Sequence, residues 1–144
     1  MENLFKFLSD AQASLFVLFH KTWVYHWNVV GPDFTQLHEL FGKQYEEMFE
    51  EIDRLSEHMR YLSIKPISNL SRLNEVSHIN GGDSFANATS MLEQLLEDNT
   101  SLLNLFISIV KEAEEQNHPE TSNLIQDLME SHGKFVWQLR SHLQ

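Results

Sequence analysis

Residues 34–62 read FTQLHELFGKQYEEMFEEIDRLSEHMRYL, and apolar side chains recur through this stretch at intervals of three or four residues. They are Leu37, Phe41, Tyr45, Met48, Ile52, Leu55, Met59 and Leu62. That spacing places them on one face of an α-helix. The stretch therefore predicts a long amphipathic helix that turns one face toward a core.

The segment before this helix shows the same periodicity. Apolar side chains recur at gaps of three or four residues from Leu4 to Tyr25, and Gly31 and Pro32 then interrupt the pattern. A second, aromatic stripe lies beside the first: Phe16, Phe19, Trp23 and Trp27. This helix is therefore apolar over a wide arc. A monomer would expose part of that arc, which indicates contacts between subunits.

A long connection and a third helix follow. Pro66 is expected to end the quoted helix, because proline disfavours helical geometry in the residue before it. The stretch 66–82 is long for a plain loop and predicts a small helix within it. Asp83 or Ser84 is the expected N-cap of the third helix, which places Phe85 on its core face.

Together these segments describe one all-α domain. A break at residues 114–119 separates the third helix from a fourth, which carries apolar residues from Ile125 to Leu143. Four long helices, with one long crossover that contains a short extra helix, predict a ferritin-like four-helix bundle. The length of 144 residues suits a single core, so we expect one ferritin-like domain over residues 1–144.

Composition restricts the location and the chemistry of the protein. The sequence has no cysteine, which excludes disulfides, thiolate metal sites and cysteine nucleophiles. No apolar run approaches the roughly 18 residues of a membrane span. The N-terminus lacks the basic and apolar regions of a signal peptide. These features favour a cytoplasmic protein without a membrane partner.

The charge disfavours nucleic acid and favours cations as partners. Ten lysines and arginines stand against 21 aspartates and glutamates, a net charge of −11 with histidine neutral. The basic residues are spread along the chain, and the sequence shows no basic tail before the first helix or after the last. Such a chain repels phosphate backbones and attracts cations. We therefore do not expect DNA binding.

The residues best suited to chemistry lie between His26 and Glu57. On the quoted helix His38, Asp53 and Glu57 share one face, and imidazole nitrogen together with carboxylate oxygen suits ferrous iron. His38 and Asp53 are about 22 Å apart along a straight helix, so one chain cannot bring them to one ion. Two antiparallel copies related by a two-fold axis can do so. A glutamate-rich helix also places acids on one face by chance, so spacing alone leaves the metal site open.

Two motifs in this region resemble the Dps family of mini-ferritins. Residues 26–41, HWNVVGPDFTQLHELF, closely resemble the ferroxidase signature of that family. Residues 53–57, DRLSE, resemble its second element, Asp-x-x-Ala-Glu-Arg. Thr121 and residues 134–137, KFVW, match features near the C-terminus of family members. The resemblance spans essentially the whole chain, and the first motif is highly specific.

The resemblance implies a ferroxidase that stores iron. In the family, two histidines and an acid come from one subunit, and an aspartate–glutamate pair comes from its two-fold mate. By position this implies His26, His38, Asp53 and Glu57 as metal ligands and catalytic residues. The implied chemistry is oxidation of Fe(II), preferably by hydrogen peroxide, with ferric mineral held in a homo-oligomeric, dodecameric shell built from two-fold dimers. Consuming iron and peroxide together limits hydroxyl-radical damage.

Several positions depart from the family pattern or from its motifs. Gly42 stands where the family usually has an aspartate ligand, and glycine also weakens a helix interior by about 1 kcal/mol. Glu46, or Glu50 of the mate, is a candidate substitute for that carboxylate. His58 replaces the usual arginine of the second element.

Three histidines lack carboxylate partners at a suitable spacing and are expected on the surface: His118, His132 and His142.

Two other functions remain open at this point. Gly42 motivates a non-catalytic shell or interaction protein whose ferroxidase centre has decayed. The name of the family suggests a DNA-compacting protein. The sequence does not decide whether one or two irons bind, or whether peroxide or oxygen is the oxidant.

Overall fold

The computed structural model describes residues 2–144, which form five helices joined by loops, with no strand in this range. Four helices are long: α1 (Glu2–Asn28), α2 (Phe34–Tyr61), α4 (Ala88–Glu115) and α5 (Pro119–Leu143). The short helix α3 (Leu70–Val76) lies in the connection between α2 and α4. The predicted all-α bundle of four helices, with a long crossover that contains a short helix, is confirmed. Within the same range, no helix combines the length and the apolar character needed to cross a membrane.

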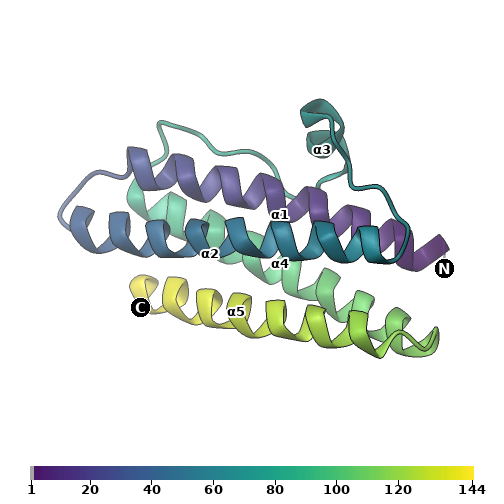
Figure 1. Cartoon of the computed structure of the whole chain (residues 1–144). Coiled ribbons are helices and arrows are strands. Elements are labelled where there is room, and N and C mark those ends of the chain that lie inside the picture. The colour runs from purple at the N-terminus through teal and green to yellow at the C-terminus, as the bar shows by residue number, and fades with distance from the viewer. Residues whose placement is uncertain (1) are drawn as a thin grey trace.

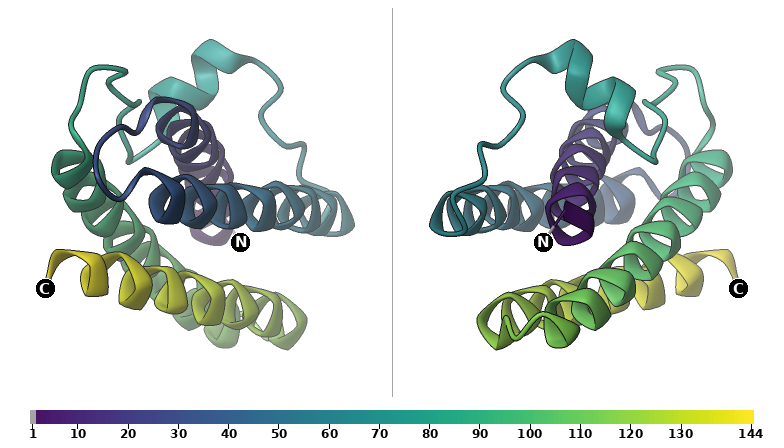
Figure 2. Two further views of the ribbon diagram at one scale, coloured as in Figure 1. Left: turned by 90° about the vertical axis from the view of Figure 1, so that its left-hand side faces the viewer. Right: turned by 90° about the vertical axis from the view of Figure 1, so that its right-hand side faces the viewer.

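The long helices pack as two antiparallel pairs, α1 with α2 and α4 with α5 (Figure 1). The crossover runs back along the bundle, so α4 runs in the same direction as α2 (Figure 1). End views place α3 outside the bundle, on the side of α1 (Figure 2). Gln12 of α1 exchanges two hydrogen bonds with the backbone of Ile67, at 2.9 and 3.1 Å. These bonds hold the crossover against α1 and satisfy loop backbone groups that have no helical partner.

The end of α2 is set by a left-handed residue. Ser63 has a φ of 66°, and its N–H donates to the carbonyl of Arg60 at 3.0 Å. The N–H of Ile64 donates to the carbonyl of Met59 at 2.8 Å, which completes a Schellman cap. The helix is already closed when the chain reaches Pro66. The prediction that this proline ends the helix is therefore wrong.

The predicted start of α4 is also wrong. Asn87, not Asp83 or Ser84, is the N-cap, because its side-chain oxygen accepts from the N–H of Ser90 at 2.8 Å. Asp83 instead closes a turn by accepting from the N–H of Phe85 at 2.9 Å. Phe85, expected on the core face, is consequently 96% exposed.

A buried hydrogen-bonded cluster joins α2, α4 and α5. His132 of α5 is 0% exposed, and its Nδ1 lies 2.8 Å from Oδ1 of Asn99 on α4. Because the Asn99 amide nitrogen donates to the carbonyl of Leu95 at 2.7 Å, the amide oxygen faces the imidazole and accepts from Nδ1. The other ring nitrogen, Nε2, lies 3.1 and 3.0 Å from the two carboxylate oxygens of Glu51 on α2. One proton is thus held between the imidazole and the carboxylate.

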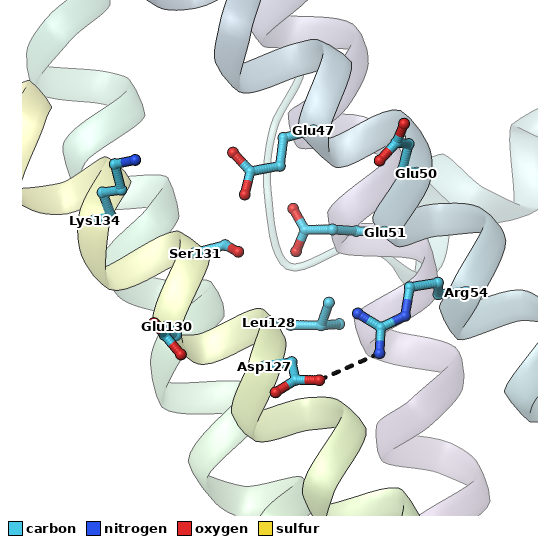
Figure 3. Close-up of a pocket in the computed structure, with 9 residues that line it drawn as sticks. All are labelled: Glu47, Glu50, Glu51, Arg54, Asp127, Leu128, Glu130, Ser131 and Lys134. Atoms are coloured by element: carbon cyan, nitrogen blue, oxygen red, sulfur yellow. Dashed lines mark hydrogen bonds and ion pairs between the residues drawn. The ribbon is translucent and has the colours of Figure 1, made fainter.

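This cluster corrects the expected surface position of His132. Its partner Glu51 lies 81 residues earlier in the chain, so no local spacing reveals the pair. Figure 3 shows the Glu51 side chain extending from α2 toward α5. Phe106 and Phe135 pack edge-on against the imidazole, with ring centroids 5.6 and 4.9 Å away. The histidine is a core residue that supplies the hydrogen bonds which two other buried polar side chains need.

Removing the imidazole is expected to destabilise the bundle strongly. His132→Ala leaves the Glu51 carboxylate and the Asn99 amide oxygen buried without the imidazole partner, which costs about 3–5 kcal/mol in comparable buried pairs. Urea unfolding followed by circular dichroism, at one fixed protein concentration, measures the change in the free energy of unfolding. The exposed His142→Ala is the control and should change it by no more than about 0.5 kcal/mol. Equal values for the two variants would contradict the role assigned to the cluster.

Candidate metal site

Two histidines meet where α1 passes into α2. His26 lies in the last turn of α1 and His38 in the second turn of α2, and the connection between the helices turns at Gly31, whose φ of 119° favours glycine. The two imidazole rings stack nearly parallel, with centroids 3.8 Å apart and planes 12° from each other. Phe34 stacks on His38 in turn, at 5.1 Å between centroids. The α1–α2 corner therefore brings together two residues that the sequence analysis selected.

Each histidine is hydrogen-bonded to the backbone of the other. Nδ1 of His26 lies 2.6 Å from the carbonyl oxygen of His38, and Nδ1 of His38 lies 2.7 Å from the carbonyl oxygen of His26. A carbonyl only accepts, so both Nδ1 atoms carry the proton and donate. In the neutral ring this leaves Nε2 with a free lone pair. Neither Nε2 is hydrogen-bonded within residues 2–144, and a metal-binding histidine commonly donates its other N–H to a carbonyl in this way.

Two carboxylates lie together near the other end of α2. Asp53 and Glu57 are exposed and one helical turn apart. A hydrogen bond with the Asp53 side chain, followed by its negative charge, raises the pKa of Glu57 above its usual value. The two carboxylates are therefore close neighbours on the surface of α2. A cation held between them would relieve the repulsion.

A single chain does not unite these two pairs. The structure brings His26 to His38, and Asp53 to Glu57, at separate places on α2. His38 and Asp53 are about 22 Å apart along the helix. No cluster of three or more histidine, aspartate, glutamate or cysteine residues that could hold a metal ion occurs in the part of the chain from 2 to 144. Each pair is thus half of a candidate site.

An aromatic surface on α1 and α2 lies between the two pairs. Its members are Phe16, Phe19, Trp23, Trp27, Tyr45 and Phe49. Phe19 is at the centre, within 6.1 Å of four other rings by centroid distance. Phe49 is 65% exposed, and two adjoining hollows of about 560 and 550 Å³ open along this surface. An exposed apolar patch of this kind marks an interaction surface.

The carboxylates considered as substitutes for an acid at Gly42 lie on this aromatic surface. Glu46 and Glu50 are exposed, and both line the hollow formed by Phe19, Trp23, Tyr45 and Phe49. Within one chain they are not part of the histidine pair. Gly42 itself is buried against the His26 imidazole.

Two other histidines, His58 and His118, lie where the end of α2 meets the α4–α5 turn. Nε2 of His58 lies 2.8 Å from the hydroxyl of Thr121, and Nδ1 of His118 lies 2.9 Å from Glu120. Burial lowers the pKa of His58, while the Glu120 charge raises it and His118 lowers it. The hydrogen bond from His118 lowers the pKa of Glu120. His118, expected on the surface, is partly buried, whereas His142 is exposed as expected.

An acidic groove runs between α2 and α5 (Figure 3). Its volume is about 470 Å³, and five of its lining residues are acidic: Glu47, Glu50, Glu51, Asp127 and Glu130. Arg54 crosses part of the groove to Asp127, at 3.3 Å (Figure 3). No local sequence pattern reveals this groove, because helices distant in the sequence build its walls. The buried Glu51 connects it to the His132 cluster.

Comparison with known proteins identifies the family. The family model described as a ferritin-like domain matches residues 5–144. An uncharacterised low temperature-induced protein of Nostoc sp. is 32% identical over 146 residues, covering 99% of this chain and 81% of that protein. DNA protection during starvation protein 2 of Bacillus anthracis is 28% identical over 142 residues, covering 99% of this chain and 97% of that protein.

Solved structures give the same answer for the fold. The crystal structure of a Dps protein from Vibrio cholerae O1, described as a member of a broad superfamily of ferritin-like diiron-carboxylate proteins, superposes with a TM-score of 0.94. It is 28% identical, with 99% of this chain and 90% of that chain covered. The predicted ferritin-like fold is thereby confirmed. The chain belongs to the ferritin-like proteins and, among them, to the Dps family.

Proposed function

We propose that this protein binds Fe(II) as its substrate and oxidises it at a site shared by two copies of the chain. His26 and His38 of one copy and Asp53 and Glu57 of the other are the proposed ligands. The observation that carries the proposal is the reciprocal hydrogen bonding of the histidine pair, which leaves both Nε2 atoms free to coordinate. Two imidazoles with two carboxylates form a mixed nitrogen and oxygen donor set that suits ferrous iron.

Two-fold pairing of α2 is the proposed way to join the half-sites. In an antiparallel pair, His38 of one copy lies opposite the Asp53–Glu57 turn of the other, and the axis passes near Tyr45 and Glu46. That point lies within the exposed aromatic surface, next to Phe49. Covering this surface removes apolar area from water and so favours the same dimer. The homo-oligomer, expected to be dodecameric, is built from such dimers.

The reaction needs an oxidant, and the proposed oxidant, hydrogen peroxide, accepts two electrons when it is reduced to water. Two ferrous ions give one electron each to one hydrogen peroxide molecule, which takes up two protons and leaves as two water molecules. No hydroxyl radical is released when both electrons reach the same peroxide. The ferric product hydrolyses and is stored inside the oligomer. The description of the Vibrio cholerae relative as a diiron-carboxylate protein and the name of the Bacillus anthracis relative, which refers to DNA protection, support this assignment.

The acidic character of the chain supports iron as cargo more than DNA as a partner. The groove between α2 and α5 carries five acidic residues against Arg54 and Lys134. With a net charge of −11, such surfaces concentrate cations and repel phosphate. Protection of DNA by removal of iron and peroxide requires no contact with DNA. Direct DNA binding is therefore not part of the proposal.

Iron oxidation by metal-free protein tests the function. With hydrogen peroxide, wild-type protein should oxidise Fe(II) well above the protein-free rate, followed by absorbance of the ferric product. His26→Ala and Asp53→Ala should each lower that rate by about tenfold or more, since each removes a proposed ligand. The exposed His142→Ala should behave as wild type. A wild-type rate equal to that of buffer would instead support a non-catalytic shell.

Mixing the two inactive variants tests whether the site is shared. In a heterodimer of His26→Ala and Asp53→Ala chains, one site has lost both residues and the other is intact. Refolding an equal mixture should therefore restore roughly a quarter of the wild-type activity, because half of the dimers are mixed and each has one working site. Separately refolded variants remain inactive. Absence of recovery in a co-assembled mixture would contradict a between-subunit site.

The aromatic surface should be needed for assembly. Phe49→Glu places a charge in the proposed two-fold interface, where burying it without a partner is unfavourable. Sedimentation equilibrium should show a lower mass than for wild type. Phe85→Glu is the matched control, because Phe85 is even more exposed but lies in the crossover. If both variants assemble like wild type, the interface lies elsewhere.

A further inference from the structure

Gly42 lies in α2, one turn after His38, and the His26 imidazole lies next to the place that a side chain at position 42 would occupy. A Cβ atom at this position would lie 3.0 Å from Cε1 and 3.1 Å from Nδ1 of His26. Such contacts are shorter than ordinary van der Waals separation, so the imidazole would have to move. A carboxylate at this position would need still more room than a methyl group.

The His26 ring has little freedom to move away. Its Nδ1, one of the two atoms that a Cβ would approach, donates to the carbonyl of His38 at 2.6 Å. In an α-helix that same carbonyl accepts from the N–H of the residue four positions on, which is Gly42. The imidazole therefore sits on the helical turn over which a side chain at position 42 would stand. Its face is stacked on His38 at 3.8 Å, and Tyr45 lies 5.2 Å away between centroids.

We infer that Gly42 is a positioning residue, whose missing side chain provides the space in which His26 docks on His38 as a preassembled pair of nitrogen ligands. The glycine is then a requirement of this arrangement and not the remnant of a lost ligand. A side chain at position 42 pushes the His26 ring away from this place and so strains the hydrogen bond that fixes its tautomer. An aspartate there therefore requires the His26 ring to shift from its present position on His38.

The docked pair supplies two neutral nitrogen ligands to the shared site, and the carboxylates of Asp53 and Glu57 supply its oxygen ligands. This donor set rests on the proposed function, because it takes the two carboxylates from the mate. The docking of His26 against Gly42 does not depend on it.

Cobalt binding tests the positioning role without any oxidation. Co(II) is titrated into metal-free protein by calorimetry, with the visible absorption of the bound ion as a second signal. Wild type gives the reference affinity and the reference number of Co(II) ions bound per subunit. Gly42→Ala and Gly42→Asp should both bind about tenfold or more weakly, as when a group that orients a ligand is lost. Gly133→Ala in α5 is the matched control, because a Cβ at that glycine meets no atom within 4 Å, and it should bind like wild type.

Tighter binding by Gly42→Asp, or more Co(II) ions per subunit than wild type binds, would overturn the inference. Circular dichroism and sedimentation are the controls that each variant folds and assembles. Gly42→Ala makes the smallest addition possible at this position, a single methyl group.

A metal-free crystal structure of Gly42→Ala separates this inference from the proposed function. Displacement of the His26 ring from His38 supports the positioning role even if wild-type protein oxidises no iron. An unmoved ring, still hydrogen-bonded to the His38 carbonyl, would overturn it even if iron oxidation proceeds as proposed.

Discussion

The reciprocal hydrogen bonds between His26 and His38 close the corner between α1 and α2, and the proposed chemistry depends on that corner. The carbonyl of His26 belongs to the last turn of α1, where helix carbonyls have no partner within the helix. The His38 imidazole satisfies it. The same contact therefore ends one helix, aligns it with the next and fixes the proton of a candidate ligand. Each histidine ring is oriented by the backbone carbonyl of the other histidine and by stacking on its ring. With only one of the two histidines present, these contacts would not fix the rotamer and the tautomer of the remaining ring.

The placement of functional groups along α2 explains why the proposed active unit is a pair of chains. The nitrogen donors lie at the α1–α2 corner, next to the start of α2, and the oxygen donors lie near the end of α2. A rigid helix keeps these groups apart, and only a second, oppositely directed helix can bring the two kinds together. The aromatic surface between them supplies the apolar area that such a contact would bury. In the proposed dimer, assembly and site formation both follow from one arrangement of residues on α1 and α2.

Local patterns predicted the long helices well, because each long helix buries one stripe of side chains. Such a stripe appears in the sequence as apolar residues at every third or fourth position. Motifs also identified the two histidines that the structure brings together. The sequence failed where a distant residue decides the outcome. The cap of α4 is set by Asn87 and not by the equally suitable Asp83, whose N–H instead donates to the hydroxyl of Tyr25 on α1 at 3.1 Å. The contact between Gly42 and His26 joins two helices, so the glycine looked like a missing ligand.

The buried cluster of Glu51, Asn99 and His132 has a consequence for how the helices can pack. Apolar stripes of leucine tolerate sliding by one helical turn, since one apolar side chain replaces another at little cost. A carboxylate, an amide and an imidazole do not exchange in this way. If α5 slid by one turn, Glu51 would face an apolar side chain and remain buried without a partner. The cluster links helices that are far apart in the chain. Its hydrogen bonds form in only one register of these helices, whereas the apolar core alone would accept several.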